Sequence, residues 1–165
     1  SGSHERCNII EVMGRTAGHI ALWCGIANGS EYALLPETYN ESEIDKLIAQ
    51  INEKTKIGKR HHIVVNAEGI GHSEEIAKRI KEETGIDTRA TIIGHIQRGG
   101  SPTCRDRVYA SAMGSRAVDL LHQGQTSRVV AFCHGEFTDY SIQAAMEMQK
   151  TIDHNFDKLI HKLSR

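Results

Sequence analysis

Residues 61–94 read HHIVVNAEGIGHSEEIAKRIKEETGIDTRATIIG, and this stretch decides the fold class. It begins with a largely apolar run at 61–67 and ends with a second one at 88–94. Between the two runs, apolar residues recur at helical spacing over 73–84, and Gly85 marks the end of that helix. A strand, a helix and a strand in this order, with strands rich in Val and Ile, predict parallel neighbours in a sheet that helices cover on both faces.

The same alternation extends to both sides of this segment. Further strands are predicted at 7–13, 31–35 and 128–134, and further helices at 18–28, 41–57 and 102–122, with two more helices completing the chain. The helix at 18–28 is apolar nearly all round, so we expect it to be buried. The predicted helix caps are Asn40 with Glu43 as a capping box, Ser73, and Ser101 before Pro102.

Composition excludes several classes of function. The 165 residues have a formal net charge of −1 and 25% charged residues, which does not favour nucleic acid or an anionic membrane as a partner. No apolar run approaches the ~18 residues that cross a bilayer, and the N-terminus has no signal-peptide pattern. The four cysteines lack the spacing of zinc or redox motifs, so we expect free thiols, no bound metal and a cytoplasmic location.

Charged or titratable residues beside glycine follow three of the predicted strands. Met13-Gly14-Arg15 follows the first strand, Glu68-Gly69 follows 61–67, and His95-Ile96-Gln97-Arg98 follows 88–94. Parallel sheets bind ligands outside the carboxyl ends of their strands, and glycine lets the backbone approach a ligand closely. Arg donors suit a phosphate, and a Glu carboxylate accepts hydrogen bonds from hydroxyls. The pattern predicts a site for a small, hydroxyl-rich phosphorylated metabolite.

A second set of charged residues lies at the opposite, starting edge of the predicted sheet. It contains Arg6, Arg89, Glu31 and the run Lys59-Arg60-His61. Six residues separate Arg89 from His95, or about 20 Å along an extended strand, so the two should not meet on one small ligand within one chain. If both bind phosphate, Arg89 serves a neighbouring subunit. Taken singly, each of these residues fits a solvated surface charge at least as well as a binding role.

Three sequence motifs resemble those of 6-phosphofructokinases of the bacterial type. They are EVMGR at 11–15, NAEG at 66–69 and the long, specific TRATIIGHIQRGGSP at 88–102, in the family's order. The resemblance covers nearly the whole chain and corresponds to the second half of the family's chain. It implies a three-layer α/β fold with a mostly parallel sheet and helices on both faces.

The resemblance also implies a division of the chain. Residues 1–100 would form a sugar-phosphate-binding domain, 101–150 a remnant of the nucleotide-binding lobe, and 151–165 a C-terminal helix returning to the first domain. The remnant would expose Val108, Ala112, Ala117 and Leu120 or their neighbours.

In that family, a tetramer transfers the γ-phosphoryl group of ATP, with Mg²⁺, to the 1-hydroxyl of fructose 6-phosphate in glycolysis. The resemblance implies that His95 and Arg98, beside Ile96 and Gln97, bind the 6-phosphate, and that Arg6 and Arg89 reach it from the neighbouring subunit. It implies that Glu68 accepts hydrogen bonds from the sugar. It further implies backbone contacts from Met13 and Gly14, and stabilisation of the transferring phosphoryl group by Arg15.

An effector site is implied in the same way. Gly29, Ser30 and Glu31, with Lys59, Arg60 and His61, match the family's site for ADP, where phosphoenolpyruvate competes. Ile57 departs from this pattern, because a basic residue is common at its position.

The family's glycine-rich ATP loops, Mg²⁺ ligand and catalytic aspartate have no counterpart in these residues. We therefore expect the chain alone to be inactive and to bind neither ATP nor Mg²⁺ by itself. Two other interpretations stay open, a non-catalytic module that binds sugar phosphate or nucleotide, and an oligomerisation domain. A pyrophosphate-dependent parent enzyme also stays open, although His95 within GHIQRGGSP favours ATP.

Overall fold

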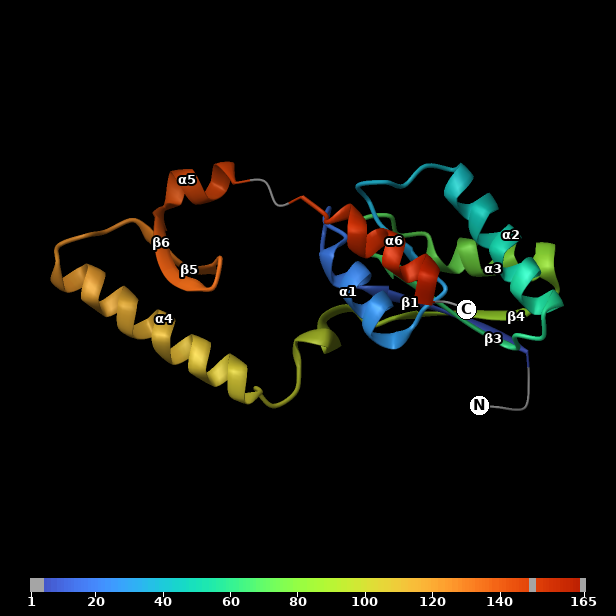
Figure 1. Ribbon diagram of the computed structural model, residues 1–165, viewed down its shortest axis with the longest axis horizontal. Coiled ribbons are helices and arrows are strands. Elements are labelled where there is room, and N and C mark those ends of the chain that lie inside the picture. The colour runs from blue at the N-terminus through green and yellow to red at the C-terminus, as the bar shows by residue number, and fades with distance from the viewer. Residues whose placement is uncertain (1–4, 149–150, 164–165) are drawn as a thin grey trace. The chain divides into compact units, whose positions relative to one another are not determined.

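The computed structural model describes residues 5–148 and 151–163 of the chain. These residues form two compact units, and most of their elements are labelled in Figure 1. Unit 1 comprises Ser1–Gly99 and Ile152–Arg165, and unit 2 comprises Gly100–Thr151. Residues 1–4, 149–150 and 164–165, which belong to the three domain ranges expected above, lie outside the described residues.

Unit 1 is built on a four-stranded parallel sheet. Its strands are β1 (Arg6–Val12), β2 (Tyr32–Leu34), β3 (His61–Ala67) and β4 (Asp87–Ile92), in the spatial order β2-β3-β1-β4. In this register Ile9 of β1 lies opposite Val64 of β3 and Ala90 of β4. The mostly parallel sheet predicted from the sequence is confirmed, with the ends of β1, β2 and β4 shifted by one or two residues.

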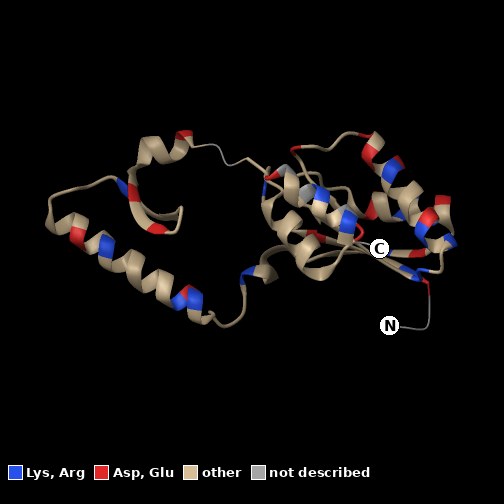
Figure 2. Ribbon diagram, in the orientation of Figure 1, with Lys and Arg blue, Asp and Glu red and all other residues tan. Residues whose placement is uncertain are grey.

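Helices cover both faces of this sheet (Figure 1). They are α1 (His19–Asn28), α2 (Ser42–Lys56), α3 (Ser73–Thr84) and α6 (His154–Leu163). α2 and α3 share one core with Val64, whereas α1 and α6 share the other with Val65. Successive residues of β3 thus enter opposite cores, as the alternation of side chains along a strand requires. Acidic and basic residues are interspersed along the solvent side of α2 (Figure 2).

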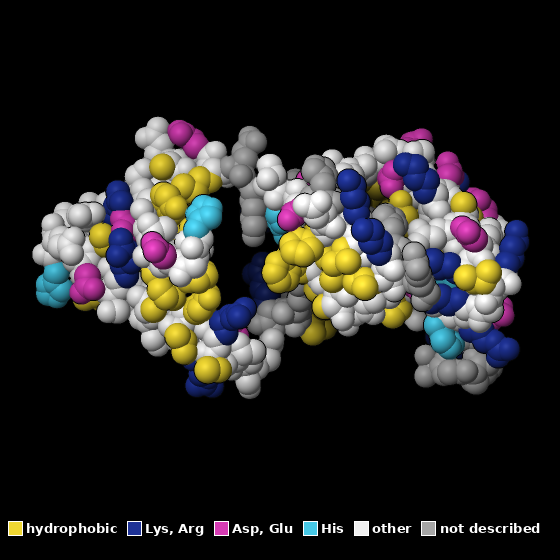
Figure 3. Space-filling view, viewed as in Figure 1, with side chains coloured by type: hydrophobic (Ala, Val, Ile, Leu, Met, Phe, Trp, Pro, Cys, Tyr) yellow, Lys and Arg dark blue, Asp and Glu magenta, His cyan; other side chains and the backbone are white. Residues whose placement is uncertain are grey.

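The prediction that the helix at 18–28 is buried holds for one side of the helix only. Trp23 is 66% exposed and packs edge-on against Phe156 of α6, with ring centroids 6.0 Å apart. Figure 3 shows hydrophobic side chains grouped on this face of unit 1. Only Ala21, Leu22 and Gly25 of α1 are buried. Apolar character all round the helix did not reveal which side the sheet would cover.

Two predicted caps in unit 1 also differ from the structure. The Asn40 side-chain oxygen accepts from the N–H of Ser42 at 3.0 Å, and Glu43 binds the hydroxyl of Tyr32 at 2.6 Å, so no capping box forms. Ser73 is the first residue of α3, and its hydroxyl donates to Glu11 instead of accepting from a helix N–H. Ser73 is thus engaged by a tertiary partner, Glu11 of β1, whereas Asn40 is engaged locally by Ser42.

Unit 2 contains a long helix and a hairpin. Its elements are α4 (Cys104–His122), β5 (Arg128–Cys133), β6 (Glu136–Ser141) and α5 (Ile142–Glu147). β5 and β6 are antiparallel, and β6 was not predicted. Thr103, not Ser101, is the N-cap of α4, because it forms a capping box with Asp106. The strand missed at β6 begins after Gly135, at a turn whose residues His134 and Gly135 both have positive φ.

Side chains of α4 pack on this hairpin. Tyr109 lies 4.6 Å from Phe132 and 5.3 Å from Phe137, measured between ring centroids. Leu120 is buried, but its neighbour Leu121 is 64% exposed and Val108 is 55% exposed. No helix in residues 5–148 or 151–163 is long and apolar enough to cross a membrane.

Candidate functional site

The loops after β1 and β3 meet at the carboxyl edge of the parallel sheet. Oε1 of Glu68 accepts hydrogen bonds from the backbone N–H groups of Gly14 at 2.9 Å and Arg15 at 2.6 Å. Oε1 of Gln97 accepts from the N–H of Met13 at 3.0 Å. The structure therefore brings together the three strand-end segments that the sequence singled out.

The third segment is a helical turn. β4 ends at Ile92, not at Gly94 as predicted, and Gly94–Arg98 forms the 3₁₀ helix η1. Because such a helix turns every three residues, its side chains point in different directions. Gln97 is half-buried against Met13, whereas His95, Ile96 and Arg98 are exposed.

Two glycines allow the loops to approach this closely. A Cβ atom on Gly69 would lie 2.1 Å from the carbonyl oxygen of Arg15 and 3.0 Å from Cγ of Pro36. Gly14 has a φ of +154°, and a Cβ there would lie 2.4 Å from the carbonyl oxygen of Ala17. At both positions a side chain would collide with a backbone carbonyl oxygen, so only glycine fits.

A second carboxylate, which the sequence analysis missed, holds the other end of the β1–α1 loop. Glu37 accepts hydrogen bonds from the N–H of Gly18 at 2.9 and 3.1 Å to its two oxygens, just before α1 begins. Glu37 lies shortly after the end of β2, and an acidic residue in that position is the feature by which the sequence could have revealed it. Glu37 and Glu68 together fix this loop through its own N–H groups.

Electrostatics keep Glu68 ionised. Hydrogen bonds from the backbone N–H groups of Arg15 and Gly14, with the positive charges of Arg15 and Arg98, hold the pKa of Glu68 below its ordinary value of 4.5. Both of its hydrogen bonds end on Oε1, and Oε2 accepts none from residues 5–148 or 151–163. An anchored carboxylate with one open oxygen is suited to a ligand hydroxyl, and the exposed His95 and Arg98 are suited to an anion.

Arg6 and Arg89 lie at the starting edge, around Asp87. Nε of Arg89 is 3.5 Å from the Asp87 carboxylate, and Arg6 is in register with Asp87 on the adjacent strand. A hydrogen bond from Lys81, and then the charges of Arg89 and Arg6, lower the pKa of Asp87. The structure thus brings these two arginines near one carboxylate, at the other end of β4 from His95.

The predicted effector residues lie near the same starting edge. Gly29 ends α1 with a φ of +62°, and Ser30 and Glu31 are buried. Glu31 accepts a hydrogen bond from the N–H of Ile63 and forms an ion pair with Lys59. Arg60 and His61 are exposed, and Ile57 is 79% exposed.

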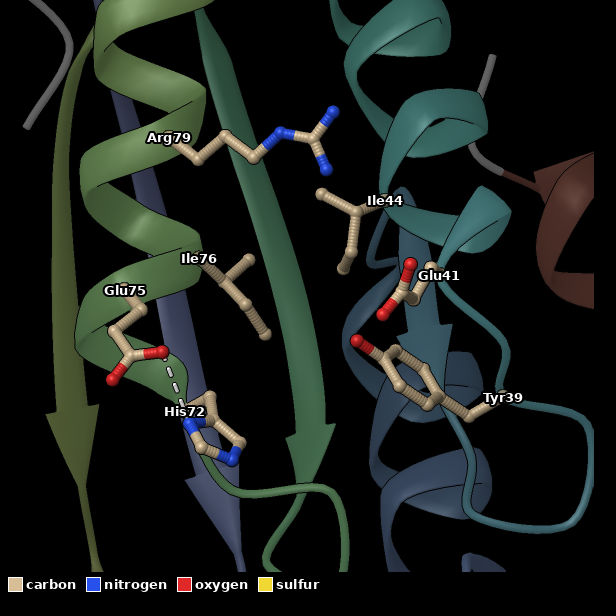
Figure 4. Close-up of a pocket in the computed structure, with 7 residues that line it drawn as sticks. All are labelled: Tyr39, Glu41, Ile44, His72, Glu75, Ile76 and Arg79. Carbon is tan, nitrogen blue, oxygen red and sulfur yellow. Dashed lines mark hydrogen bonds and ion pairs between the residues drawn. The ribbon is translucent and has the colours of Figure 1, made fainter.

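A separate hollow of about 320 Å³ lies between α2 and α3 (Figure 4). Its lining residues are Tyr39, Glu41, Ile44, His72, Glu75, Ile76 and Arg79. His72 lies 3.0 Å from Glu75, and Arg79 is paired with Asp45 and Glu83, so charged groups around the hollow bind one another. None of the site residues predicted from the sequence lines it.

No group of three or more His, Cys, Asp or Glu side chains placed to hold a metal ion occurs in the described part of the chain. All four cysteines are free, as expected. Cys7 is fully buried, and this burial, with the negative charge of Glu31, raises the pKa of its thiol to about 12.

A parallel sheet with helices on both faces defines an α/β protein, and the carboxyl edge of such a sheet is the usual place for a ligand. Comparison with known proteins narrows this class. Residues 1–121 match the family described as Phosphofructokinase. The ATP-dependent 6-phosphofructokinase of Clostridium botulinum (strain Loch Maree / Type A3) is 48% identical over 165 residues, which are 100% of this chain and 51% of the relative.

Two further similarities agree. The ATP-dependent 6-phosphofructokinase of Bacillus cytotoxicus is 46% identical over 162 residues, or 98% of this chain and 50% of the relative. The crystal structure of Pichia pastoris phosphofructokinase in the T-state matches with a TM-score of 0.80 and 31% identity, covering 99% of this chain and 20% of that chain.

The chain belongs to the phosphofructokinase family. It spans about half the length of the curated relatives that it matches. The fold expected from the resemblance is confirmed.

Proposed function

We propose that this chain is the sugar-phosphate-binding half of an ATP-dependent 6-phosphofructokinase, which phosphorylates fructose 6-phosphate with ATP in glycolysis. On its own it binds fructose 6-phosphate without transferring phosphate. The observation that supports this most is the state of Glu68, whose Oε1 is bonded to the N–H groups of Gly14 and Arg15 and whose Oε2 has no described partner. An anchored acceptor beside the exposed His95 and Arg98 fits a ligand with both hydroxyls and a phosphate.

The remaining roles of the substrate site follow the same proposal. His95 and Arg98 bind the 6-phosphate, Ile96 and Gln97 line the site, Met13 and Gly14 make backbone contacts, and Arg15 stabilises the transferring phosphoryl group. Arg6 and Arg89 reach the phosphate of a neighbouring copy in a homo-oligomer, a tetramer in the intact enzyme. Their place at the opposite edge from His95 supports a shared site.

We assign the starting edge to an effector, ADP or phosphoenolpyruvate, bound by Gly29, Ser30, Glu31, Lys59, Arg60 and His61. ATP and Mg²⁺ act in the intact enzyme, which we place in the cytoplasm. Unit 1 is then the sugar-phosphate domain, to which the C-terminal helix belongs, since Ile160 of α6 lies in its core. Unit 2 is the remnant of the nucleotide lobe.

The test is calorimetric titration of the chain with fructose 6-phosphate, with the mass of the oligomer measured alongside. We expect binding by an assembled species, and no binding of fructose, which lacks the phosphate. Glu68→Gln should weaken the affinity about tenfold or more, because it removes a charged acceptor. Glu74→Gln, an exposed residue of α3, is the matched control and should bind as the wild type does.

Mixed oligomers test the shared site. Chains with Arg89→Ala and chains with His95→Ala should each bind weakly alone, and mixing them should restore part of the binding. Assembly that is indifferent to phosphate ligands would instead favour the oligomerisation domain. Absence of recovery in the mixture would contradict sharing between subunits.

A further inference from the structure

A buried chain of hydrogen bonds lies behind the turn that carries Glu68. Asn66, which is 0% exposed, donates from Nδ2 to the carbonyl oxygen of Gly71 and to Oγ of Ser73, both at 2.8 Å. Oγ of Ser73 donates to Oε2 of Glu11 at 2.6 Å. Asn66 belongs to β3, Ser73 to α3 and Glu11 to β1, so this relay links three elements of unit 1.

The direction of each hydrogen bond in the relay follows from chemistry. A carbonyl oxygen only accepts, so the NH₂ group of Asn66 must face Gly71. Its Oδ1 then points elsewhere, and it has no hydrogen-bond partner among the described residues. Leaving a buried acceptor unpaired costs free energy. A valine at this position of β3 would avoid that cost. The amide is therefore better explained by its hydrogen bonds to Gly71 and Ser73 than by core packing.

The turn held by Asn66 is the one that places Glu68. The N–H of Glu68 donates to the carbonyl of Val12 at 2.9 Å, and the N–H of Ile70 donates to the carbonyl of Ala67 at 3.0 Å. Gly71 and His72 follow with φ of +65° and +54°, which are left-handed conformations. The start of the turn is therefore tied to β1, and its return is tied to Asn66. With both sides held, the Glu68 carboxylate has few positions available.

We propose that Asn66 and Ser73 are positioning residues that keep Glu68 on the Gly14 and Arg15 N–H groups, with its second oxygen presented to the ligand. They act through the turn at residues 68–71 and do not touch the ligand. The part of this inference that concerns the ligand rests on the proposed function. The part that concerns the geometry of Glu68 does not.

The test compares Asn66→Val and Ser73→Ala with Thr84→Val. Thr84 lies at the other end of α3, where its hydroxyl donates to Ile80 at 2.7 Å and accepts from Ile86 at 3.2 Å, so the control also removes one hydroxyl from this helix. The first readout is the NMR titration of the Glu68 side-chain carboxyl carbon. The second is calorimetric titration with fructose 6-phosphate.

Asn66→Val and Ser73→Ala should raise the titration midpoint of Glu68 toward 4.5 and weaken fructose 6-phosphate binding about tenfold, as loss of outer hydrogen bonds does at other sites. Thr84→Val should lower the melting temperature without moving either readout. An unchanged Glu68 titration in both test variants, or an equal shift in Thr84→Val, would overturn the proposal.

Two failures stay distinguishable. If Asn66→Val does not fold, Ser73→Ala decides the question, since it removes a single oxygen atom. If the wild-type chain does not bind fructose 6-phosphate, the proposed function fails for the isolated chain, whereas the Glu68 titration still decides whether Asn66 and Ser73 position this carboxylate.

Discussion

The carboxylate of Glu31 lies 2.5 Å from Nζ of Lys59, and the Glu31 side chain is only 3% exposed. The N–H of Ile63 donates to the same carboxylate. One predicted effector-site cation therefore neutralises one predicted effector-site anion within the chain. Of the basic run, Arg60 and His61 are left exposed. If the proposed effector site binds an anion, Arg60 and His61 are its exposed cations, since Lys59 is paired with Glu31.

Lys59→Met should destabilise unit 1 by about 1–3 kcal/mol, because it removes the cation that is paired with the buried Glu31 carboxylate and leaves only the charge of Lys54 acting on it. The measurement is urea unfolding at neutral pH. Lys56→Met, at an exposed position of the last turn of α2, is the matched control and should stay within about 0.5 kcal/mol of the wild type. Equal stability of the two variants would show that the pair contributes nothing.

Glu68 should make stability depend on acid pH. Its pKa is lowered from 4.5 in the folded chain, so its stabilising contribution is fully present above pH 4.5 and is lost as the pH falls through the lower folded-state pKa. Below pH 4.5 the melting temperature of Glu68→Gln should therefore fall less steeply than that of the wild type. The comparison is a series of thermal melts across this pH range. Parallel curves would contradict the geometry described for Oε1.

Gly69→Ala should destabilise unit 1 by about 1–3 kcal/mol, because the added methyl group overlaps the backbone of Arg15 and forces two loops apart. The same variant should lose affinity for fructose 6-phosphate. Gly114→Ala is the contrasting control, since a Cβ there meets no atom within 4 Å. That change in α4 should stabilise by about 0.5–1 kcal/mol. Wild-type stability of Gly69→Ala in denaturant would contradict the close approach.

Asp139→Asn should loosen unit 2. Its carboxylate pairs with Arg116 of α4 and Arg128 of β5, which hold its pKa below the ordinary value of 3.8, Arg128 having the larger effect. Amide exchange in β5 and β6 should therefore become faster, with β3 of unit 1 as an internal reference. Asp119→Asn, at an exposed position of α4, should leave exchange unchanged. Faster exchange in both variants alike would point to a loss of negative charge, not to the two ion pairs.

Much of the fold of unit 1 could be predicted from local patterns. The run at 61–67 became β3 without a change of boundary, and Gly85 ends α3 in a left-handed conformation as a C-cap glycine does. The patterns failed where other hydrogen-bond partners compete, whether two residues away or far along the chain. Asn40 and Ser73 have the chemistry of caps, but Ser42 and Glu11 offered other hydrogen bonds. Nothing local marked Trp23 as the exposed side of an apolar helix.

The candidate site was predicted in part. Residues after the ends of β1, β3 and β4 were named because parallel strands bring their carboxyl ends to one edge. Glu37 and Asn66 were not named as site residues, although each holds a loop of that edge through a backbone group. A carboxylate in a loop and an amide in a strand can form many different hydrogen bonds. Only the position of the partner atom in the fold shows which one forms.

By itself the sequence determined the alternation of strands and helices, the parallel sheet and the family, because hydrophobic periodicity and the words EVMGR and TRATIIGHIQRGGSP are local properties of the chain. Only the tertiary structure decided which atoms meet. Glu68 binds Arg15 across 53 positions of sequence, and Glu31 selects Lys59 across 28. Such contacts form or fail with shifts of roughly a few tenths of an ångström between packed elements, which no periodicity encodes.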